Sequence, residues 1–468
     1  MHNNIMSNFT VQAGTLHAGW ALLPDGWTRD VRLTIGEDGR IGSLETGRAA
    51  QAEDHRLVDR LLLPAPGNLH SHAFQRAMAG MSEYRRGGDD FWSWRALMYQ
   101  FLALLDPDQI EAIAAMVQVE MLEAGYAAVG EFHYLHHRPD GGAYDRPAET
   151  SAAVAAAAAR SGIGLTHLPV FYACGGAGGQ PLETHQRRFG CDLERFAGLL
   201  ADAEDALAPL PADRRLGLAP HSLRAVLPEH LPVLAGLRPS DPVHIHIAEQ
   251  QREIEEIEAW LGTRPVAWLQ QAIAPDARWC LVHATHMDAT ETRQLAASGA
   301  VAGLCPITEA NLGDGLFEAP AYLAAGGAFG IGSDSNIRIA LSEELRLLEY
   351  GQRLRDRGRA IMAPEGRSVG RHLYEQALAG GARALGRESG ALAPGLWADL
   401  LTLDADDLAF AARAPERWLD AWLFAGDDRA VREVWAAGRP VVRDGRHRAR
   451  REVERDYRAV LADLADRL

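Results

Sequence analysis

Short apolar runs alternate with longer helical stretches through the middle of the chain. Alternation of this kind indicates parallel β-α-β units. Because there are eight runs, we predict a closed barrel rather than an open doubly wound sheet. The runs are Leu61–Leu63, AAVGEF at Val129, GIGLTHLPVFY at Leu165, RLGLAPH at Leu216, PVHIHIAE at Ile245, WCLVHATH at Val282, AVAGLCP at Val301 and AFGIGSDSN at Ile331.

Both ends of the chain contain short strand-like segments. VQAGTLHAGWALL and VRLTIGEDGRIGSLE near the start, and ALAPGLWADLLTLD and VREVWAAGRPVVRDGRH near the end, have this pattern. We expect these segments to pair into one small β-sandwich. The predicted fold is therefore α/β, with a (β/α)8 TIM-like barrel over residues 64–390. Residues 1–63 and 391–468 would form the sandwich, and the second segment would also carry a terminal helix.

The composition limits which partners the protein can have. The chain has 468 residues, of which 47% are hydrophobic and 24% charged, as in soluble globular proteins. The net charge of -16 argues against nucleic acid and anionic membranes, since both need clustered positive charge. An anionic small molecule remains compatible with this charge, because one or two arginines in a pocket can bind it.

Cysteine usage and hydrophobicity bear on location. The four cysteines are scattered and form no C-x-x-C pair, and no stretch approaches the roughly 20 apolar residues of a membrane span. The start, MHNNIMSNFT, has no basic region followed by an apolar run, so we expect no signal peptide. We expect a reduced cytoplasmic protein and a homodimer.

Lysine is absent from the sequence, and all 47 basic residues are arginine. Catalysis through a lysine Schiff base and phosphate binding by a Walker-A lysine are therefore excluded. A two-metal centre bridged by a carboxylated lysine is excluded for the same reason.

Histidines follow or end three of the predicted strands. His70 and His72 in NLHSHAFQR are two residues apart, so both imidazoles point the same way if the segment is extended. His244 and His246 alternate in PVHIHIAE, and only one of them needs to be a ligand. His283 ends the next strand. Each motif alone is also typical of a turn or of a buried core histidine.

Two carboxylates complete this pattern. Asp334 follows the last apolar run in FGIGSDSN, and Glu249 follows His246 by three residues. Glu249 could overhang a metal without binding it, or it could be an acid favoured at a helix start. Because the carboxyl ends of barrel strands share one face, we predict one ion held by His70, His72, His246 and Asp334.

Nitrogen and oxygen ligands of this kind suit Zn²⁺, although iron or another divalent metal is compatible with the same set. Three histidines and one aspartate leave room for a water. The ion would lower the pKa of that water toward roughly 7 and so provide hydroxide at neutral pH.

With these motifs the sequence resembles the amidohydrolase superfamily, and PGLWADLLTLD is similar to its flanking strands. HIAE and the missing lysine resemble its single-metal deaminases. NLHSHAFQRAMAG, FWSWRALMY, EFHYLHH, APHSLRAV and HIHIAEQ together resemble the formimidoylglutamate deiminases. That family converts N-formimino-L-glutamate and water to N-formyl-L-glutamate and ammonia in histidine degradation.

The resemblance implies hydrolytic deimination by a metal-bound hydroxide. His283 and Asp334 would orient the water and take its proton. Glu249 would protonate the imine nitrogen and then the leaving ammonia, a task that suits a carboxyl group with a pKa near the operating pH.

The dicarboxylate part of this substrate needs charge-assisted hydrogen-bond donors. Arg224 and His221 in PHSLR directly follow the fourth apolar run and are the first candidates. The resemblance adds Gln75, Arg95 and Tyr134. The alternative is another single-metal deaminase acting on a nucleobase or related heterocycle, whose pocket should present amide and aromatic groups. A non-catalytic barrel would be expected to lack part of the metal set.

Overall fold

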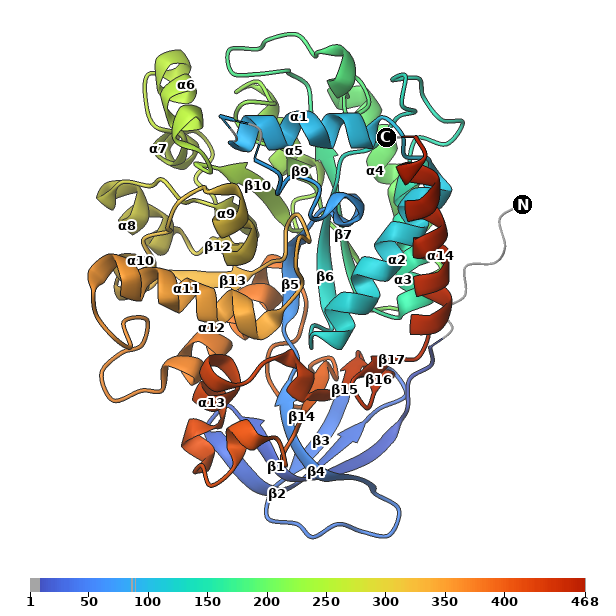
Figure 1. Ribbon diagram of the computed structural model, residues 1–468, viewed down its shortest axis with the longest axis vertical. Coiled ribbons are helices and arrows are strands. Elements are labelled where there is room, and N and C mark those ends of the chain that lie inside the picture. The colour runs from blue at the N-terminus through green and yellow to red at the C-terminus, as the bar shows by residue number, and fades with distance from the viewer. Residues whose placement is uncertain (1–8, 86, 89, 468) are drawn as a thin grey trace.

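Parallel strands in chain order form the barrel at the centre of the molecule (Figure 1). The computed structural model describes residues 9–85, 87–88 and 90–467, so residues 1–8, on which the expectation about a signal peptide rests, lie outside it. The barrel strands are β5 (Gly67–Ser71), β6 (Ala128–His133), β7 (Gly164–Phe171), β8 (Arg215–Leu216), β9 (Ala219–Pro220), β10 (Val243–Ile247), β11 (Trp279–His283), β12 (Val301–Leu304) and β13 (Ala328–Ile331).

Two sheets make up the barrel wall, and single bridges join them. Strands β5, β6, β7 and β8 form one sheet, with β9 on β7, and β10 to β13 form the other. Parallel bridges connect Ser71 with Asp334 at one seam and Leu218 with Val243 at the other. The last strand therefore lies beside the first, and the predicted barrel fold is confirmed.

Helices surround the strands (Figure 1). Helix α3 contains the alanine-rich stretch of the sequence, and its small side chains let it pack closely against α2 and β7. Within the described part of the chain, no helix is long and apolar enough to cross a membrane. The helices are α1 (Phe91–Leu102), α2 (Pro107–Glu123), α3 (Glu149–Ser161), α4 (Leu193–Leu207), α5 (His230–Leu237), α6 (Gln251–Leu261), α7 (Pro265–Ala272), α8 (Ala289–Ser298), α9 (Pro306–Leu312), α10 (Ala319–Ala324), α11 (Leu341–Asp356) and α12 (Val369–Ala384).

The prediction that Leu61–Leu63 forms the first barrel strand is wrong. These leucines belong to β4 (His55–Pro64), which pairs with the chain-end strands, and the first barrel strand is β5. Only two residues separate the two strands, and both strands are buried where they meet. The apolar pattern therefore continues from β4 into β5. Because β5 leads directly out of β4, its carboxyl end points away from the chain-end sheet.

Strands from both chain ends form a single sheet below the barrel in Figure 1. Its strands are, in order, β17 (Arg446–His447), β16 (Arg439–Arg443), β15 (Val431–Ala436), β14 (Leu400–Asp404), β4, β1 (Gly14–Leu23), β2 (Gly26–Ile35) and β3 (Ile41–Glu45). Strands β4 and β14 pair with each other and so join the two ends of the chain. The sheet curls back on itself, since Arg40 bridges Trp397 and Ile41 donates to the Leu396 carbonyl at 2.8 Å. The segments from both chain ends therefore pair with one another as expected, in one curled sheet with its own hydrophobic core.

The remaining elements belong to these chain ends and to the loops. Helix α14 is the predicted terminal helix, and it packs on α2. The bounds are α13 (Trp418–Ala425), α14 (Arg450–Ala465), and the 3-10 turns η1 (Ala73–Met78), η2 (Thr184–Gln186), η3 (Leu408–Phe410), η4 (Pro415–Arg417) and η5 (Asp428–Ala430).

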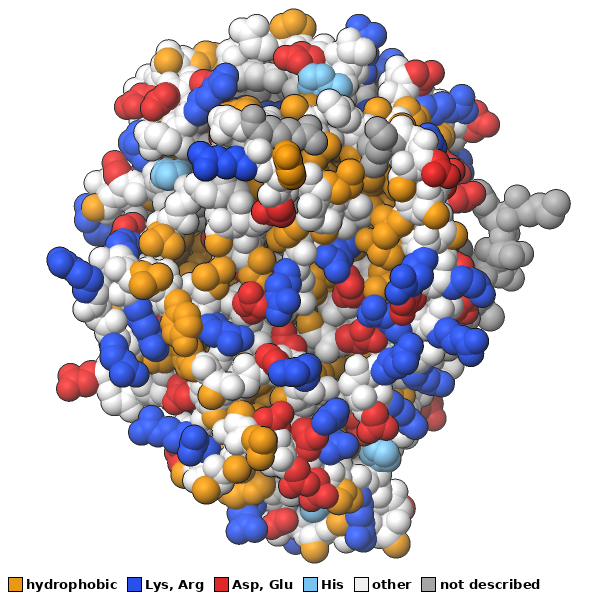
Figure 2. Space-filling view, in the orientation of Figure 1, with side chains coloured by type: hydrophobic (Ala, Val, Ile, Leu, Met, Phe, Trp, Pro, Cys, Tyr) orange, Lys and Arg blue, Asp and Glu red, His pale blue; other side chains and the backbone are white. Residues whose placement is uncertain are grey.

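Charged side chains lie mixed on the molecular face in Figure 2, where arginines and acids are interspersed. A different group of charges is buried between the barrel and the chain-end sheet. Asp213 accepts from Arg387 at 2.9 Å and from Arg439 at 2.8 Å, and Arg387 also contacts Asp399 at 2.6 Å. All four side chains are nearly inaccessible to water, so each charge depends on its partners.

Substitution of Asp213 with asparagine is expected to lower the free energy of unfolding by about 3–5 kcal/mol, because it leaves a buried positive charge uncompensated. Although burial alone would raise it, Arg439 and Arg387 lower the pKa of Asp213 from 3.8 to about 2. The stabilisation should therefore be complete above pH 4 and be lost as the pH falls toward 2. Urea unfolding over this pH range measures both effects.

Glu204→Gln is the control for this measurement. Glu204 pairs with Arg238 at 2.9 Å, but its side chain is mostly exposed. An exposed pair contributes about 0–1 kcal/mol, so this variant should unfold almost as the wild type does. Equal stabilities of the two variants would contradict a structural role for the buried network.

Candidate active site

The four predicted metal ligands meet at the carboxyl ends of β5, β10 and β13. His70 lies in β5 and His72 directly follows it, His246 lies in β10, and Asp334 follows β13. The Asp334 amide donates to the His70 carbonyl at 3.0 Å, and the His72 amide donates to the Asp334 carbonyl at 2.9 Å. The seam of the barrel therefore positions three of the four side chains.

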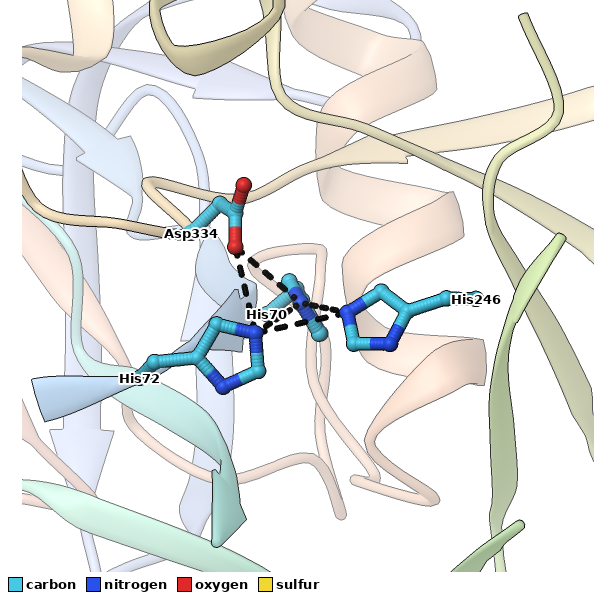
Figure 3. Close-up of side chains that lie close together, drawn as sticks. All are labelled: His70, His72, His246 and Asp334. Atoms are coloured by element: carbon cyan, nitrogen blue, oxygen red, sulfur yellow. Dashed lines mark hydrogen bonds and ion pairs between the residues drawn. The ribbon is translucent and has the colours of Figure 1, made fainter. Parts of the chain in front are cut away.

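The imidazole nitrogens of this cluster converge on one point (Figure 3). The Nε2 atom of His70 lies 3.2 Å from that of His72 and 3.0 Å from that of His246, and the latter two are 3.3 Å apart. Asp334 Oδ1 lies 3.4 Å from His70 Nε2 and 3.3 Å from His72 Nε2. Tetrahedral zinc with Zn–N bonds of 2.0–2.1 Å separates its nitrogen ligands by about 3.3 Å, which is close to this spacing.

Hydrogen bonds at the far side of two rings define their tautomers. The Nδ1 atom of His72 lies 2.9 Å from the Phe132 carbonyl, and that of His246 lies 3.1 Å from the His221 carbonyl. Carbonyl oxygens only accept, so both Nδ1 atoms carry the proton and both Nε2 atoms present a lone pair. Facing lone pairs repel unless a cation lies between them, so these residues fit a metal ion.

Burial determines the charge of the cluster. It lowers the pKa of His70 to about 3 and also lowers the pKa of His72 and His246, so the three imidazoles are neutral at pH 7. Burial opposes ionisation of Asp334, but the hydrogen bond with His70 and the neighbouring histidines hold its pKa below the ordinary value. Neutral imidazoles and one carboxylate are the protonation states that metal ligands need.

The structure decides between the two histidines of β10. His244 points away from the cluster, because its Nε2 atom contacts the Ala384 carbonyl at 2.8 Å on the helical side of the wall. His246 points inward, as alternation along a strand requires.

Glu249 and His283 lie beside the cluster. His283 Nε2 is 3.7 Å from Glu249 Oε1, and its Nδ1 atom is 3.2 Å from Glu309 Oε1. Burial opposes the charged form of His283, but Glu249, Glu309 and Asp334 outweigh it and raise its pKa to about 10. Burial raises the pKa of Glu249. Two titratable side chains therefore lie next to the metal-ligand cluster.

Sequence analysis missed Glu253 and Glu309, which hold this arrangement in place. Glu253 accepts from the Ala248 amide at 3.2 Å and from the Glu249 amide at 3.1 Å. Both carboxylates lie in a helix after a strand rather than at the strand end. A carboxylate in the first helical turn was the signal that could have identified Glu309, which lies in α9.

The predicted substrate-binding residues line the same small cavity, of about 50 Å³, as the catalytic side chains. Arg224 is 6% exposed, and its Nε atom makes no hydrogen bond to any described residue. Its nearest acids, Glu249 at 3.7 Å and Glu253 at 4.0 Å, lie beyond hydrogen-bonding distance. The predicted residues along this cavity are His72, Gln75, Arg95, Tyr134, His221, Arg224, His246, Glu249, His283 and Asp334, and His70 lies against His72 and His246.

A parallel barrel with three histidines and one aspartate at its mouth defines a class of hydrolases, and comparison with known proteins identifies the family. The model of the amidohydrolase family matches residues 61–441, and the model of the N-terminal domain of formimidoylglutamate deiminase HutF matches residues 14–57. The chain belongs to the amidohydrolase family and, within it, to the formimidoylglutamate deiminases.

Individual relatives agree with this assignment. A formimidoylglutamate deiminase from Pseudomonas aeruginosa is 52% identical over 95% of this chain and 98% of its own length. The crystal structure of an amidohydrolase from Brucella melitensis has a TM-score of 0.92 and 48% identity, over 96% of this chain and 99% of that one. A 5-methylthioadenosine/S-adenosylhomocysteine deaminase from Natronomonas pharaonis is 28% identical over 80% of this chain and 81% of its own length.

Proposed function

We propose that this chain hydrolyses N-formimino-L-glutamate to N-formyl-L-glutamate and ammonia with the aid of one zinc ion. The observation that supports the proposal most strongly is the placement of two arginines, Arg95 and Arg224, in the cavity that contains the metal-ligand cluster. Guanidinium groups match carboxylates in shape and charge, and this substrate carries two carboxylates away from its reacting carbon.

His70, His72, His246 and Asp334 would hold the ion. When bound, it would lower the pKa of a water ligand and polarise the amidine carbon–nitrogen bond. Zinc suits this nitrogen-rich set, although iron or another divalent metal could occupy it as well.

Glu249 and His283 would move the protons of the reaction. A cation in the cluster would repel the protonated form of His283 and shift its pKa down from about 10, so that its imidazole can accept a proton. Asp334 would help to orient the attacking water. Burial raises the pKa of Glu249, which favours its protonated form and suits it to deliver a proton to the imine nitrogen.

The remaining predicted side chains would bind the glutamate part of the substrate. Arg224 and Arg95 would each take up a carboxylate. Gln75 donates to the Tyr134 hydroxyl at 3.1 Å, which orients both groups along the cavity wall. His221 lies next to Tyr134, with 5.8 Å between the centroids of the two rings.

A deaminase acting on a nucleobase or related heterocycle is the second candidate. The 28% identical relative deaminates 5-methylthioadenosine or S-adenosylhomocysteine according to its name. A pocket for a neutral heterocycle would not need buried guanidinium groups, because these cost desolvation energy when no anion compensates them. Ammonia release from formiminoglutamate, guanine, cytosine and adenosine, measured side by side, separates the two candidates.

Arg224→Met is expected to lower kcat/KM for formiminoglutamate by about 100-fold or more, since loss of one partner of a buried charge pair costs about 2–5 kcal/mol. KM should rise strongly, and kcat should fall because distant binding energy aligns the reacting carbon. Steady-state kinetics of ammonia release measure both constants.

A substrate without carboxylates is the control for this variant. Wild type and Arg224→Met should turn over an alkyl formamidine equally slowly. A change of less than about twofold in kcat/KM for formiminoglutamate, which is below ~0.5 kcal/mol, would contradict the assignment of Arg224.

A further inference from the structure

A second cavity, of about 890 Å³, lies outside the small cavity that contains the catalytic side chains. Arg95 and Arg224 line both cavities, so the two meet at these side chains. Trp92 and Arg252 line only the outer one. Trp92 belongs to α1, which lies across the top of the barrel strands in Figure 1, and Arg252 belongs to α6. A ligand that approaches through the outer cavity therefore passes these two side chains first.

Three guanidinium groups surround the indole ring of Trp92. The central carbon of Arg252 lies 4.4 Å from the ring centroid, and those of Arg95 and Arg224 lie at 5.6 and 5.8 Å. Cations within about 6 Å of an indole face are attracted by its electron density. The ring thus gathers three like charges that would otherwise repel one another.

The acids nearby do not neutralise all three guanidinium groups. Arg252 pairs with Glu256 at 2.7 Å, in an ion pair with a half-exposed arginine. Arg95 donates to the Tyr172 hydroxyl at 3.1 Å and pairs with no described carboxylate. A protein with a net charge of -16 repels a dianion in general. Arg95, which pairs with no described carboxylate, adds a positive charge that opposes this repulsion where the two cavities meet.

The small volume of the inner cavity also indicates that part of the substrate must extend toward the outer cavity. A volume of about 50 Å³ accommodates a few water molecules, which is less than a dicarboxylate with a formimino group requires. When the reacting end lies at the metal ligands, the other end must extend toward Arg95 and Arg224. The outer cavity, with Arg252 on its wall, lies directly beyond them.

We propose that Arg252, held against Trp92, forms an outer carboxylate site that takes up dicarboxylates before they reach the catalytic cavity. The site would bind one carboxylate at the mouth and pass it to Arg224 and Arg95, which lie around the same indole. This inference deepens the proposed function and rests on it for the identity of the dicarboxylate. It adds Arg252 and Trp92 to the residues that select an acidic substrate.

Arg252→Met is the variant that tests the outer site, and Arg458→Met is its matched control. Arg458 is also an exposed helical arginine, and it pairs with Glu454 four residues away at 2.6 Å. It lines neither of the two cavities, and both variants remove one positive charge. Two measurements are needed on zinc-loaded protein at low ionic strength. They are calorimetric binding of glutarate and steady-state hydrolysis of formiminoglutamate.

We expect Arg252→Met to weaken glutarate binding and to raise KM by about three- to tenfold, with kcat within twofold of wild type. The difference should shrink in 0.5 M salt, since an exposed charge is screened there. Arg458→Met should match the wild type in both measurements. Glu256→Gln should have the opposite effect to Arg252→Met and lower KM, because it releases Arg252 from its acidic partner.

Equal glutarate affinity in Arg252→Met, Arg458→Met and wild type would overturn the outer site. A fall in kcat with unchanged KM would overturn it too, because Arg252 would then act on the reacting end. These results are distinct from failure of the proposed function, in which the wild type releases no ammonia from formiminoglutamate. Glutarate binding reports on the outer site in that case as well.

Discussion

Replacement of Glu249 with glutamine is expected to lower kcat by about 10²- to 10⁴-fold while the metal content stays at the wild-type level, as is typical when a general acid–base group is removed. Glu249 is buried beside the metal-ligand cluster, and its Oε1 atom lies 3.7 Å from His283 Nε2. Glutamine has nearly the same shape but cannot donate and recover the proton. Kinetics of ammonia release together with elemental analysis test this expectation.

Glu255→Gln is the control for this substitution. Glu255 lies on the exposed side of α6, so its replacement changes the charge of the same helix without touching the cavity. This variant should retain wild-type activity. If Glu249→Gln has full metal content and a near-normal kcat, Glu249 does not transfer protons in the reaction and is only an acid favoured at a helix start.

Removal of the metal is expected to abolish turnover completely, and one equivalent of zinc per chain should restore it. The three neutral imidazoles and the Asp334 carboxylate form one set of ligands, and no lysine is available to bridge a second ion. Metal should also raise the unfolding temperature, because an ion that binds only the folded state stabilises it. Chelation followed by titration with zinc measures activity and stability in the same samples.

A second group of side chains could in principle hold an ion. His283, Cys305 and Glu309 lie close enough together, but burial raises the pKa of the Cys305 thiol and so disfavours the thiolate that binds metals. Cys305→Ser should therefore leave the metal content unchanged. Two tightly bound ions per chain, both required for activity, would contradict the single-metal prediction.

The class of fold and the face of the barrel that carries the chemistry could both be predicted from the amino-acid pattern. Alternating strand and helix patterns predicted the parallel barrel, because burial on both faces leaves a continuous apolar run in each strand. Polar residues at the ends of such runs, among them His70, His72 and Asp334, must come together, since every parallel strand ends at the same face of a barrel. These inferences need only local periodicity and the direction of the strands.

The pattern of apolar residues could not show where the first barrel strand begins. Leu61–Leu63 and β5 are both buried and lie in neighbouring strands of different sheets, so hydrophobicity does not distinguish them. The two strands differ in their hydrogen-bond partners, since β4 pairs with β14 and β5 pairs with β6. The curling of the chain-end sheet depends in the same way on contacts between residues far apart in the sequence.

Which polar side chains act together depends on how the elements pack in three dimensions. His244 and His246 have equivalent spacing in the sequence, but only His246 faces the other ligands. Glu309 contacts His283 from α9, a helix that follows a different strand. Arg252 in α6 contacts Trp92 in α1, although these two helices are far apart in the chain. Such pairs carry no periodic signal, because the distance between two side chains depends on how whole elements pack rather than on their spacing along the chain.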